Sequence, residues 1–209
     1  EPPPSTFSNY RDDPLLESFF SKRLVGQRNA TAATVASYRD ALRLLVLFAA
    51  ERARRRPHAL AVADLDRDAV LAFLEHLERK RRNGAKTRNA RLTAIRSFFR
   101  HVAASDPGSL GIAQRVLAIP SKRTTTRLPP HLAPAHLAAL LAAPDRNTPQ
   151  GRRDRALLLF LARTGARVSE AVAVDAADLR LQQPCQVLLH GKGRKERVVP
   201  LSADLAQIL

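Results

Sequence analysis

The stretch GKGRKERVVPL, Gly191 to Leu201, decides how this sequence is interpreted. It places four cations within six residues, adds two glycines and runs directly into Val198 and Val199. A merely solvated run of charge needs no glycines, and a simple import signal needs no strand after it. Together with the preceding QVLLH, the pattern predicts a short β-hairpin whose turn presents Lys192 to a negatively charged partner.

The charge of the whole chain points to the same kind of partner. Among 209 residues, 35 Lys and Arg against 19 Asp and Glu give a net charge of +16. A chain this basic attracts a polyanion and releases its counterions, so nucleic acid is the first candidate; RNA-binding proteins share the property. No segment is both strongly amphipathic and rich in lysine, which argues against a membrane surface as partner.

Several classes of site are not expected. Cys185 is the only cysteine, which leaves no intrachain disulfide and no cysteine-built zinc site. The six histidines lack the spacing of metal ligands, and GKGRK does not match a nucleotide P-loop, so neither a metal nor ATP or another cofactor is implied. The apolar run 156–162 is too short to span a bilayer, and the N-terminus lacks the pattern of a signal peptide. We therefore expect a soluble, cytoplasmic protein.

The spacing of apolar residues predicts a mostly α fold that is interrupted by a linker. Residues 1–12, rich in proline and serine, are predicted to form a flexible arm. Helical patterns fill residues 13–119: one helix starts near Thr34, the next has Asp66 as its N-cap, and AKTRNARLTAIRSFFRHVAA carries a basic face. Residues 120–130 combine prolines, threonines and cations, as linkers do.

Residues 131–209 predict a smaller α+β unit. A short helix from Ala135 to Ala143 precedes a longer one through RRDRALLLFLART. Gly165 breaks that helix, and another starts at about Arg167. The two hairpin strands follow, and Ser202 is the predicted N-cap of a last helix.

Two motifs of this second unit occur in a defined order, ARTGARVSEAVAVDAADL at the helix break and GKGRKERVVPL at the hairpin. Together they resemble the first half of the catalytic domain of the tyrosine recombinases, the phage-integrase and Xer-type family. In that family TG-x-R-x-S-E is followed by an acidic residue and by strands that turn at GKG-x-K-x-R-x-x-P-L. The helical region, with TAATVASYRDALRLLVLFA and KTRNARLTAIRSFFRHV, resembles the family's SAM-like core-binding domain.

The resemblance covers almost the whole chain after residue 13. It implies a helical SAM-like core-binding DNA-binding domain at 13–119 and an incomplete α+β catalytic domain at 131–209. The implied function is site-specific recombination or integration of DNA, in which strands are broken and rejoined through a phosphotyrosyl intermediate.

The same resemblance assigns roles to individual residues. Arg167 corresponds to the first catalytic arginine, Glu170 supports it, and Lys192 donates a proton to the departing 5′-oxygen. The residue types suit these tasks, because arginine presents a planar fork to phosphate oxygens and a helix N-terminus favours an anion. Simpler roles stay open: Arg167 as a solvent-facing residue or a structural partner of Glu170, and Lys192 as a solvated turn residue.

Further residues are predicted to contact DNA. The basic face of the helix AKTRNARLTAIRSFFRHVAA either binds phosphates or is simply solvated, and residue type alone makes Thr87, Asn89 and Arg91 candidates for reading bases. Cations near the hairpin are expected to contact phosphates rather than to act as catalysts. The predicted set is Lys86, Thr87, Arg88, Asn89, Arg91, Arg96, Lys195 and Arg197.

Part of the family's machinery has no counterpart among these residues. The family carries an H-x-L-R-type box, a second His or Trp and a nucleophilic tyrosine beyond the hairpin, whereas the tyrosines here are Tyr10, in the predicted arm, and Tyr38, on an apolar helix face. Without the nucleophile no covalent intermediate forms, so the chain alone is predicted not to cleave DNA, and its status as an enzyme stays open.

Two hypotheses follow. The first is a recombinase seen in part, with double-stranded DNA as partner and a tetramer on two duplexes when full length. The second is a non-catalytic DNA-binding relic or regulator that occupies recombination sites.

Overall fold

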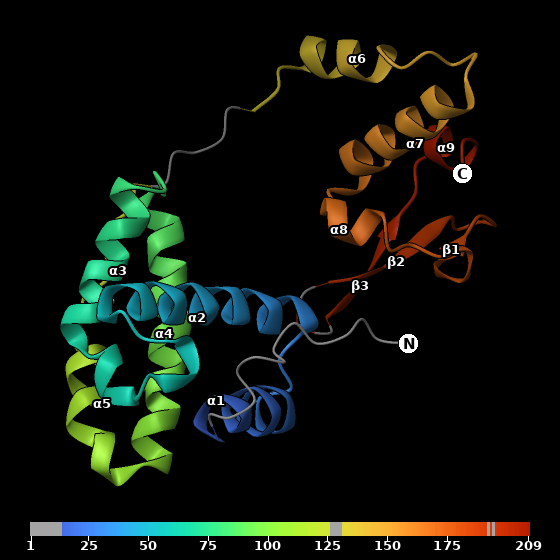
Figure 1. Cartoon of the computed structure of the whole chain (residues 1–209). Helices are drawn as coiled ribbons and strands as arrows, with labels where there is room; N and C mark the ends of the chain where they lie inside the picture. The colour runs from blue at the N-terminus through green and yellow to red at the C-terminus, as the bar shows by residue number, and fades with distance from the viewer. Residues whose placement is uncertain (1–13, 126–130, 192, 194) are drawn as a thin grey trace. The chain divides into compact units, whose positions relative to one another are not determined.

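The computed structural model describes residues 14–125, 131–191, 193 and 195–209 (Figure 1). Three predicted features are affected. The arm at 1–12 and Lys192 lie outside these residues, as does the part of the 120–130 linker from residue 126 onward. The chain divides into two units, Glu1–Thr126 and Arg127–Leu209. The described residues are mostly helical with one three-stranded antiparallel sheet, which confirms the predicted fold class.

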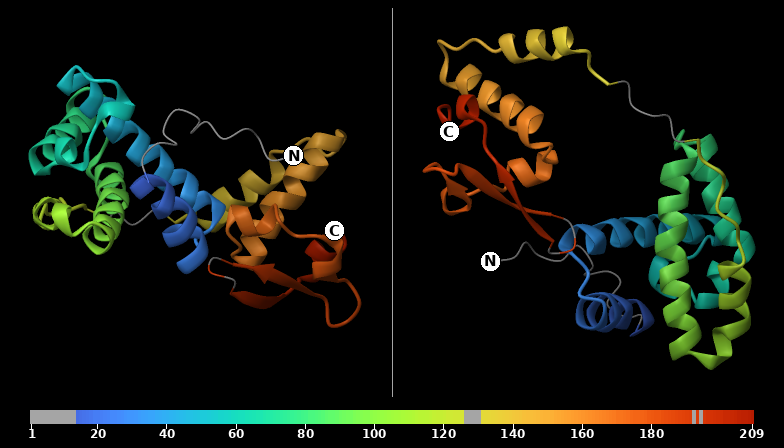
Figure 2. Two further views of the ribbon diagram at one scale, coloured as in Figure 1. Left: turned by 60° about the horizontal axis from the view of Figure 1, so that its bottom comes forward. Right: turned by 180° about the vertical axis from the view of Figure 1, so that it is seen from behind.

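The first unit consists of helices gathered around α4. In chain order they are α1 (Pro14–Ser18), the π-helix η1 (Phe19–Gln27), α2 (Ala32–Ala53), the 3₁₀ helices η2 (Pro57–Ala59) and η3 (Val62–Leu65), α3 (Arg67–Arg79), α4 (Ala85–Ser105), the 3₁₀ helix η4 (Pro107–Ser109), and α5 (Leu110–Leu117). α4 contacts α1, α2, α3 and α5, so it forms the centre of the unit (Figures 1 and 2).

Capping residues explain where two of these helices begin. The hydroxyl of Thr31 accepts a hydrogen bond from the backbone N–H of Thr34 at 3.3 Å, so α2 begins slightly before the predicted start. The carboxylate of Asp66 accepts one from the N–H of Ala69 at 2.8 Å, which confirms the predicted N-cap of α3. α5 was not predicted, because it is short and follows a turn-rich sequence.

The core of this unit is built from phenylalanine and aliphatic side chains. Phe98 of α4 contacts Phe19 and Phe99 edge-on, with both ring centroids 5.5 Å away. Leu92, Ile95, Phe98 and Phe99 are all buried, as the helical spacing predicted. Burial of this face fixes the rotation of α4 and leaves most of its polar residues exposed or partly exposed, with Arg88 and Ser97 as buried exceptions.

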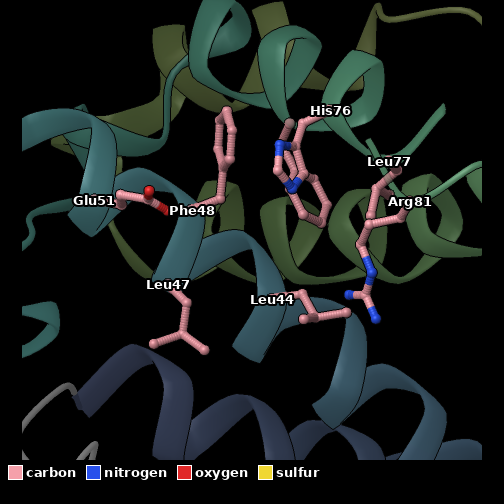
Figure 3. A pocket seen from close by; sticks show the side chains of 8 residues that line it. Leu44, Leu47, Phe48, Glu51, His76, Leu77 and Arg81 are labelled. Carbon is pink, nitrogen blue, oxygen red and sulfur yellow. The ribbon is translucent and has the colours of Figure 1, made fainter. Parts of the chain in front are cut away.

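A small pocket opens between α2 and α3 (Figure 3). Its volume of about 130 Å³ is below the roughly 300–1,000 Å³ of typical ligand pockets. The rings of Phe48 and His76 lie 5.1 Å apart within it. Its lining is formed by Leu44, Leu47, Phe48, Glu51, Phe73, His76, Leu77 and Arg81. We interpret it as a gap between packed helices and assign it no ligand.

The second unit packs helices against a small sheet. Its elements are α6 (Pro134–Ala142), α7 (Pro149–Thr164), α8 (Val168–Ala171), the 3₁₀ helix η5 (Ala176–Asp178), β1 (Leu179–Arg180), β2 (Gln186–His190), β3 (Glu196–Pro200) and α9 (Ala203–Ala206). The strand order is β1-β2-β3, and β2 pairs with β3 from Gln186↔Pro200 to His190↔Glu196. The predicted hairpin is therefore present, whereas β1 is too short to show a periodicity in the sequence.

Alternation along β2 builds the core of the second unit. Val187 and Leu189 are fully buried and point to the same face of the sheet. They pack with Leu159 and Phe160 of α7 and with residues around α9, including Leu205. The sheet and α7 are thereby held together, which places the end of α7 close to the hairpin (Figure 1).

Candidate functional site

The turn that ends α7 presents Arg167 at the surface. Gly165 has a left-handed backbone with φ of +61°, and its N–H donates to the carbonyl of Leu161 at 3.1 Å. Glycine adopts this conformation without the steric cost that other residues meet. Arg167 follows in extended conformation as the N-cap residue of α8, and its side chain is 69% exposed.

Glu170 binds two arginines with one buried carboxylate. Its side chain is only 3% exposed. Oε2 accepts a hydrogen bond from the backbone N–H of Arg167 at 2.9 Å, and Oε1 accepts one from Nη1 of Arg167 at 2.6 Å. Arg197 of β3 donates from Nη2 to Oε2 at 2.7 Å and from Nη1 to Oε1 at 3.2 Å. The fork-like pairing with Arg197 joins α8 to the hairpin.

These contacts keep Glu170 ionised. The hydrogen bonds from the Arg197 side chain and the Arg167 backbone lower the pKa of Glu170 from its ordinary 4.5 to about 2, against the opposing effect of burial. The same pairing raises the pKa of Arg197. Two guanidinium groups around one carboxylate leave a net positive charge at this surface, which favours an anion there.

Gly191 allows the hairpin to approach Glu170 closely. A Cβ atom at position 191 would lie 3.2 Å from Oε1 of Glu170 and 3.1 Å from the carbonyl oxygen of Lys195. The Gly191 N–H donates to that same carbonyl at 2.6 Å and closes the turn, in which Gly193 has φ of +78°. Lys192, the predicted proton donor, lies outside the described residues, but its neighbour Gly191 directly adjoins the Glu170 carboxylate.

His190 ties the turn end of the hairpin to η5. Its Nε2 lies 2.9 Å from Oδ1 of Asp178, and its Nδ1 lies 3.1 Å from Oε1 of Glu196. Both ring nitrogens can donate at once only when the imidazole is protonated. The hydrogen bond to Asp178 accordingly raises the pKa of His190. This residue was not predicted as part of a site; the cross-strand pairing His190↔Glu196 was the available signal.

The structure places the predicted DNA contacts in different environments. Lys86, Thr87 and Lys195 are exposed. Nη1 of Arg91 forms an ion pair with Asp40 at 2.7 Å. Three further members of the predicted set direct side-chain donors at backbone carbonyls of residues 119–122: Arg88, Asn89 and Arg96. Arg197 instead binds Glu170, which lies 27 residues earlier in the chain. That long interval hides the pairing from sequence reasoning.

Two further properties concern only the part of the chain that the structure describes. It contains no group of three or more His, Cys, Asp or Glu side chains arranged to hold a metal ion. None of its helices is long and apolar enough to cross a membrane.

Comparison with known proteins places the chain in a family. Residues 16–105 match the phage integrase N-terminal SAM-like domain, and residues 130–209 match the phage integrase family. Over 197 residues the chain is 62% identical to the putative integrase/recombinase y4rD of Sinorhizobium fredii (strain NBRC 101917 / NGR234), across 94% of this chain and 70% of that protein. The chain belongs to the phage integrase family of tyrosine recombinases.

Other relatives of this family member are Xer recombinases. It is 36% identical to tyrosine recombinase XerC of Roseiflexus castenholzii (strain DSM 13941 / HLO8), over 91% of this chain and 58% of that one. It is 34% identical to tyrosine recombinase XerD of Vibrio cholerae serotype O1 (strain ATCC 39315 / El Tor Inaba N16961), over 92% of this chain and 60% of that one. The chain thus spans less than two thirds of the length of these Xer proteins.

Solved structures share the fold. The XerH site-specific recombinase bound to palindromic difH substrate matches with a TM-score of 0.62 and 21% identity, over 91% of this chain and 55% of that one. The Tn1549 transposon integrase in complex with transposon right end DNA matches with a TM-score of 0.61 and 15% identity, over 91% and 62%. At such identities the likeness establishes the fold of this family member.

Proposed function

We propose that this chain binds the duplex DNA of a recombination site and holds a phosphodiester against Arg167 during strand breakage and rejoining. The observation that supports it most directly is the buried Glu170 carboxylate, which orients two surface arginines. Phosphoryl transfer depends on cations that are already in place beside the non-bridging oxygens. The XerH and Tn1549 integrase structures that share this fold are complexes with DNA, which supports DNA as the ligand.

In this proposal Arg167 binds the phosphate and Glu170 positions Arg167. Arg167 uses Nη1 for Glu170, while its 69% exposed side chain leaves other donors available for a phosphate. Glu170 also fixes the Arg167 backbone through its N–H, so both ends of the arginine are restrained. A restrained, partly neutralised guanidinium loses little freedom on binding an anion.

Lys192 is assigned the general-acid role. In the cleavage step a tyrosine that has lost its hydroxyl proton to solvent bonds to phosphorus as the phenolate. The bond from phosphorus to the 5′-oxygen breaks, and the Lys192 ammonium gives a proton to the departing 5′-oxygen. Support for this assignment comes from Gly191, which directly precedes Lys192. Gly191 lies close to the Glu170 carboxylate that binds Arg167 and Arg197.

The described residues contribute phosphate binding in this reaction rather than the nucleophile. Tyr38 is partly buried and packs against the core of the first unit, and Tyr10 lies outside the described residues. We therefore expect these 209 residues to bind DNA without forming a covalent link to it. The family resemblance supports a tetramer on two duplexes as the working assembly of a complete recombinase.

The first unit adds contacts to the DNA backbone. Lys86 and Thr87 are exposed in the first turn of α4, and Arg100 is exposed near its end. Each phosphate neutralised by a cation contributes about −0.9 to the slope of log K against log salt. Lys86→Ala should therefore weaken binding to all sequences alike and make the slope shallower by about 1.

The test combines DNA binding with covalent trapping on a nicked duplex. Fluorescence anisotropy should show binding at low salt that weakens steeply as salt rises. Arg167→Ala should reduce the affinity by about tenfold, because it removes a charge-assisted phosphate contact. Arg163→Ala, a change on α7 that removes the surface pair with Asp204, is the matched control and should have little effect.

Each outcome has a distinct meaning. Absence of binding at low salt would contradict the proposal as a whole. A covalent adduct would contradict only the expectation that these residues lack the nucleophile. Intact mass from the native source completes the test. A heavier native chain that traps DNA identifies a working recombinase, and a 23.0 kDa chain that binds without trapping identifies a relic or regulator of recombination sites.

A further inference from the structure

Residues Ile119–Lys122, which we call the exit segment, are held against α4 by side chains. They follow α5 and are the first residues on the way from the first unit to the second. Ile119 is buried in the core of the first unit with 1% exposure. Nη2 of Arg96 donates to the Ile119 carbonyl, and Nη1 of Arg88 donates to the Pro120 carbonyl at 3.3 Å.

Asn89 forms a two-way pair with the backbone of Lys122. Its Nδ2 donates to the Lys122 carbonyl at 2.7 Å, and its Oδ1 accepts from the Lys122 N–H at 3.0 Å. The side-chain amide thus hydrogen-bonds to the backbone N–H and C=O of Lys122, as the backbone of a neighbouring β-strand would. On the far side, Nζ of Lys122 lies 2.8 Å from both carboxylate oxygens of Glu78 in α3. The exit segment is therefore bound to two helices.

Arg88 is committed to this contact by its burial. It is only 5% exposed, and no carboxylate among the described residues forms an ion pair with it. A buried cation without a counter-charge is unfavourable unless hydrogen bonds satisfy it. Its Nη1 bonds to Pro120 and to Oδ1 of Asn89, at 3.1 Å for the latter. Arg88 and Asn89 thereby act together on the exit segment.

We propose that Arg88, Asn89, Arg96 and Glu78 form an anchor that fixes the point at which the chain leaves the first unit. Asn89 is then a positioning residue for DNA binding by both units, rather than a reader of bases. This proposal rests on the proposed DNA-binding function and names how the second unit is kept within reach of the same duplex.

The physical reason is the effective concentration of the second unit. Once one unit is on DNA, the local concentration of the other is set by the length of chain that can move between them, and it falls roughly as the −3/2 power of that length. The anchor removes residues 119–122 from that length. Releasing these four residues should weaken binding by less than about twofold, since they add little to that length.

Hydrogen exchange tests the anchor itself, independently of DNA. In the full chain, Asn89→Ala removes the acceptor for the Lys122 N–H, so exchange of that amide should accelerate by about five- to tenfold. Thr93→Ala is the matched control, because Thr93 is exposed on the same helix and its hydroxyl bonds only to a carbonyl within α4. Unchanged exchange of Lys122 in Asn89→Ala would overturn the anchor.

A double-mutant cycle tests the consequence for DNA binding. The variants are Asn89→Ala, Lys195→Ala and their combination, measured on a mixed-sequence duplex by anisotropy. If Asn89 acts by tethering the second unit, its effect should shrink when Lys195, a proposed phosphate contact of that unit, is absent. Independent contacts in separate units would instead give effects that multiply, and this result would overturn the proposal.

A duplex panel separates positioning from base reading. An anchor predicts that Asn89→Ala weakens binding to every duplex by the same factor, whereas a base reader predicts a changed sequence preference. The second result would overturn the positioning role. If the unmodified chain binds no DNA, the proposed function fails, while accelerated exchange of Lys122 in Asn89→Ala would still establish the anchor.

Discussion

At the scale of single residues, the candidate site depends on Glu170. A carboxylate with 3% exposure is stable there because three N–H groups of two arginine side chains and one backbone N–H surround it. The sequence interval between Arg167 and Glu170 already suggested that they pair. The second arginine, Arg197, lies on strand β3. Because Arg197 also binds Glu170, this carboxylate connects α8 to β3 as well as supporting Arg167.

Glu170→Gln should destabilise the second unit in a way that depends on pH. The folded-state pKa of about 2 lies below the ordinary 4.5, so the stabilisation is present above pH 4.5 and is lost as the pH falls towards 2. The variant should therefore be less stable than wild type at neutral pH, and the difference should narrow through that window. Urea unfolding at neutral pH and at about pH 3 measures it.

The control for this prediction is Glu75→Gln. Glu75 forms an exposed pair with Arg79 on α3, so its removal should change stability little at either pH. A stability difference between wild type and Glu170→Gln that does not depend on pH would contradict the assigned role of the Glu170 charge.

At the scale of elements, the β2–β3 hairpin and the end of α7 carry the site. The hairpin is held on one side by the core residues Val187 and Leu189 and next to its turn by His190. α7 ends in a glycine that sends the chain outward to Arg167. The geometry of the site therefore depends on the contacts that hold the hairpin and on the turn that ends α7.

His190 should titrate above its ordinary value. Asp178 and Glu196 raise the pKa of His190 from 6.5, so its stabilising contacts are complete below pH 6.5 and weaken as the pH rises through the raised value. An NMR titration of the imidazole protons measures this directly. Glu196→Gln and Asp178→Asn should each lower the measured pKa, and the Asp178 change should act more strongly. A pKa at or below 6.5 in the unmodified chain would contradict this arrangement.

Gly165→Ala should destabilise the second unit by about 1–2 kcal/mol, because a left-handed backbone brings Cβ too close to the following carbonyl. Gly165→Asn is the matched variant and should cost less, since asparagine tolerates this conformation better than alanine. Chemical denaturation gives both values. Equal costs for the two substitutions would indicate that the φ angle of Gly165 is not the cause.

At the scale of the whole molecule, the two units have separate hydrophobic cores. One is centred on α4 and contains Phe98, and the other is centred on β2 and contains Leu189. Proposed DNA contacts are distributed over both units. A net charge of +16 is favourable for holding a polyanion, and the two units offer it more than one surface.

Core truncations should affect the two units separately. Phe98→Ala should lower the stability of the first unit by about 3–5 kcal/mol, and Leu189→Ala that of the second by about 2–5 kcal/mol. Differential scanning calorimetry should show each variant shifting one unfolding transition and leaving the other in place. A single transition that both variants shift would show instead that the units unfold as one.

The sequence by itself determined the helical elements with long periodic patterns, the hairpin at Gly191–Lys195, the order of the two motifs and the basic charge. It also brought Arg167 and Glu170 together, because both lie within one helical turn. These features are local, or they depend only on which side of an element is apolar. Short elements such as α5 and β1 were not predicted, since a few residues carry too little periodicity.

Only the tertiary structure decided which polar groups meet across long intervals of chain. Arg197 reaches Glu170 because β2 contacts α8 and pairs with β3. Glycine suits position 191 because a Cβ atom there would lie only 3.2 Å from Oε1 of Glu170. Arg88, Asn89 and Arg96 resemble DNA contacts by residue type, yet the course of the chain after α5 supplies them with backbone partners. The physical reason is that a hydrogen-bond partner is chosen by position in space, which burial of the core determines.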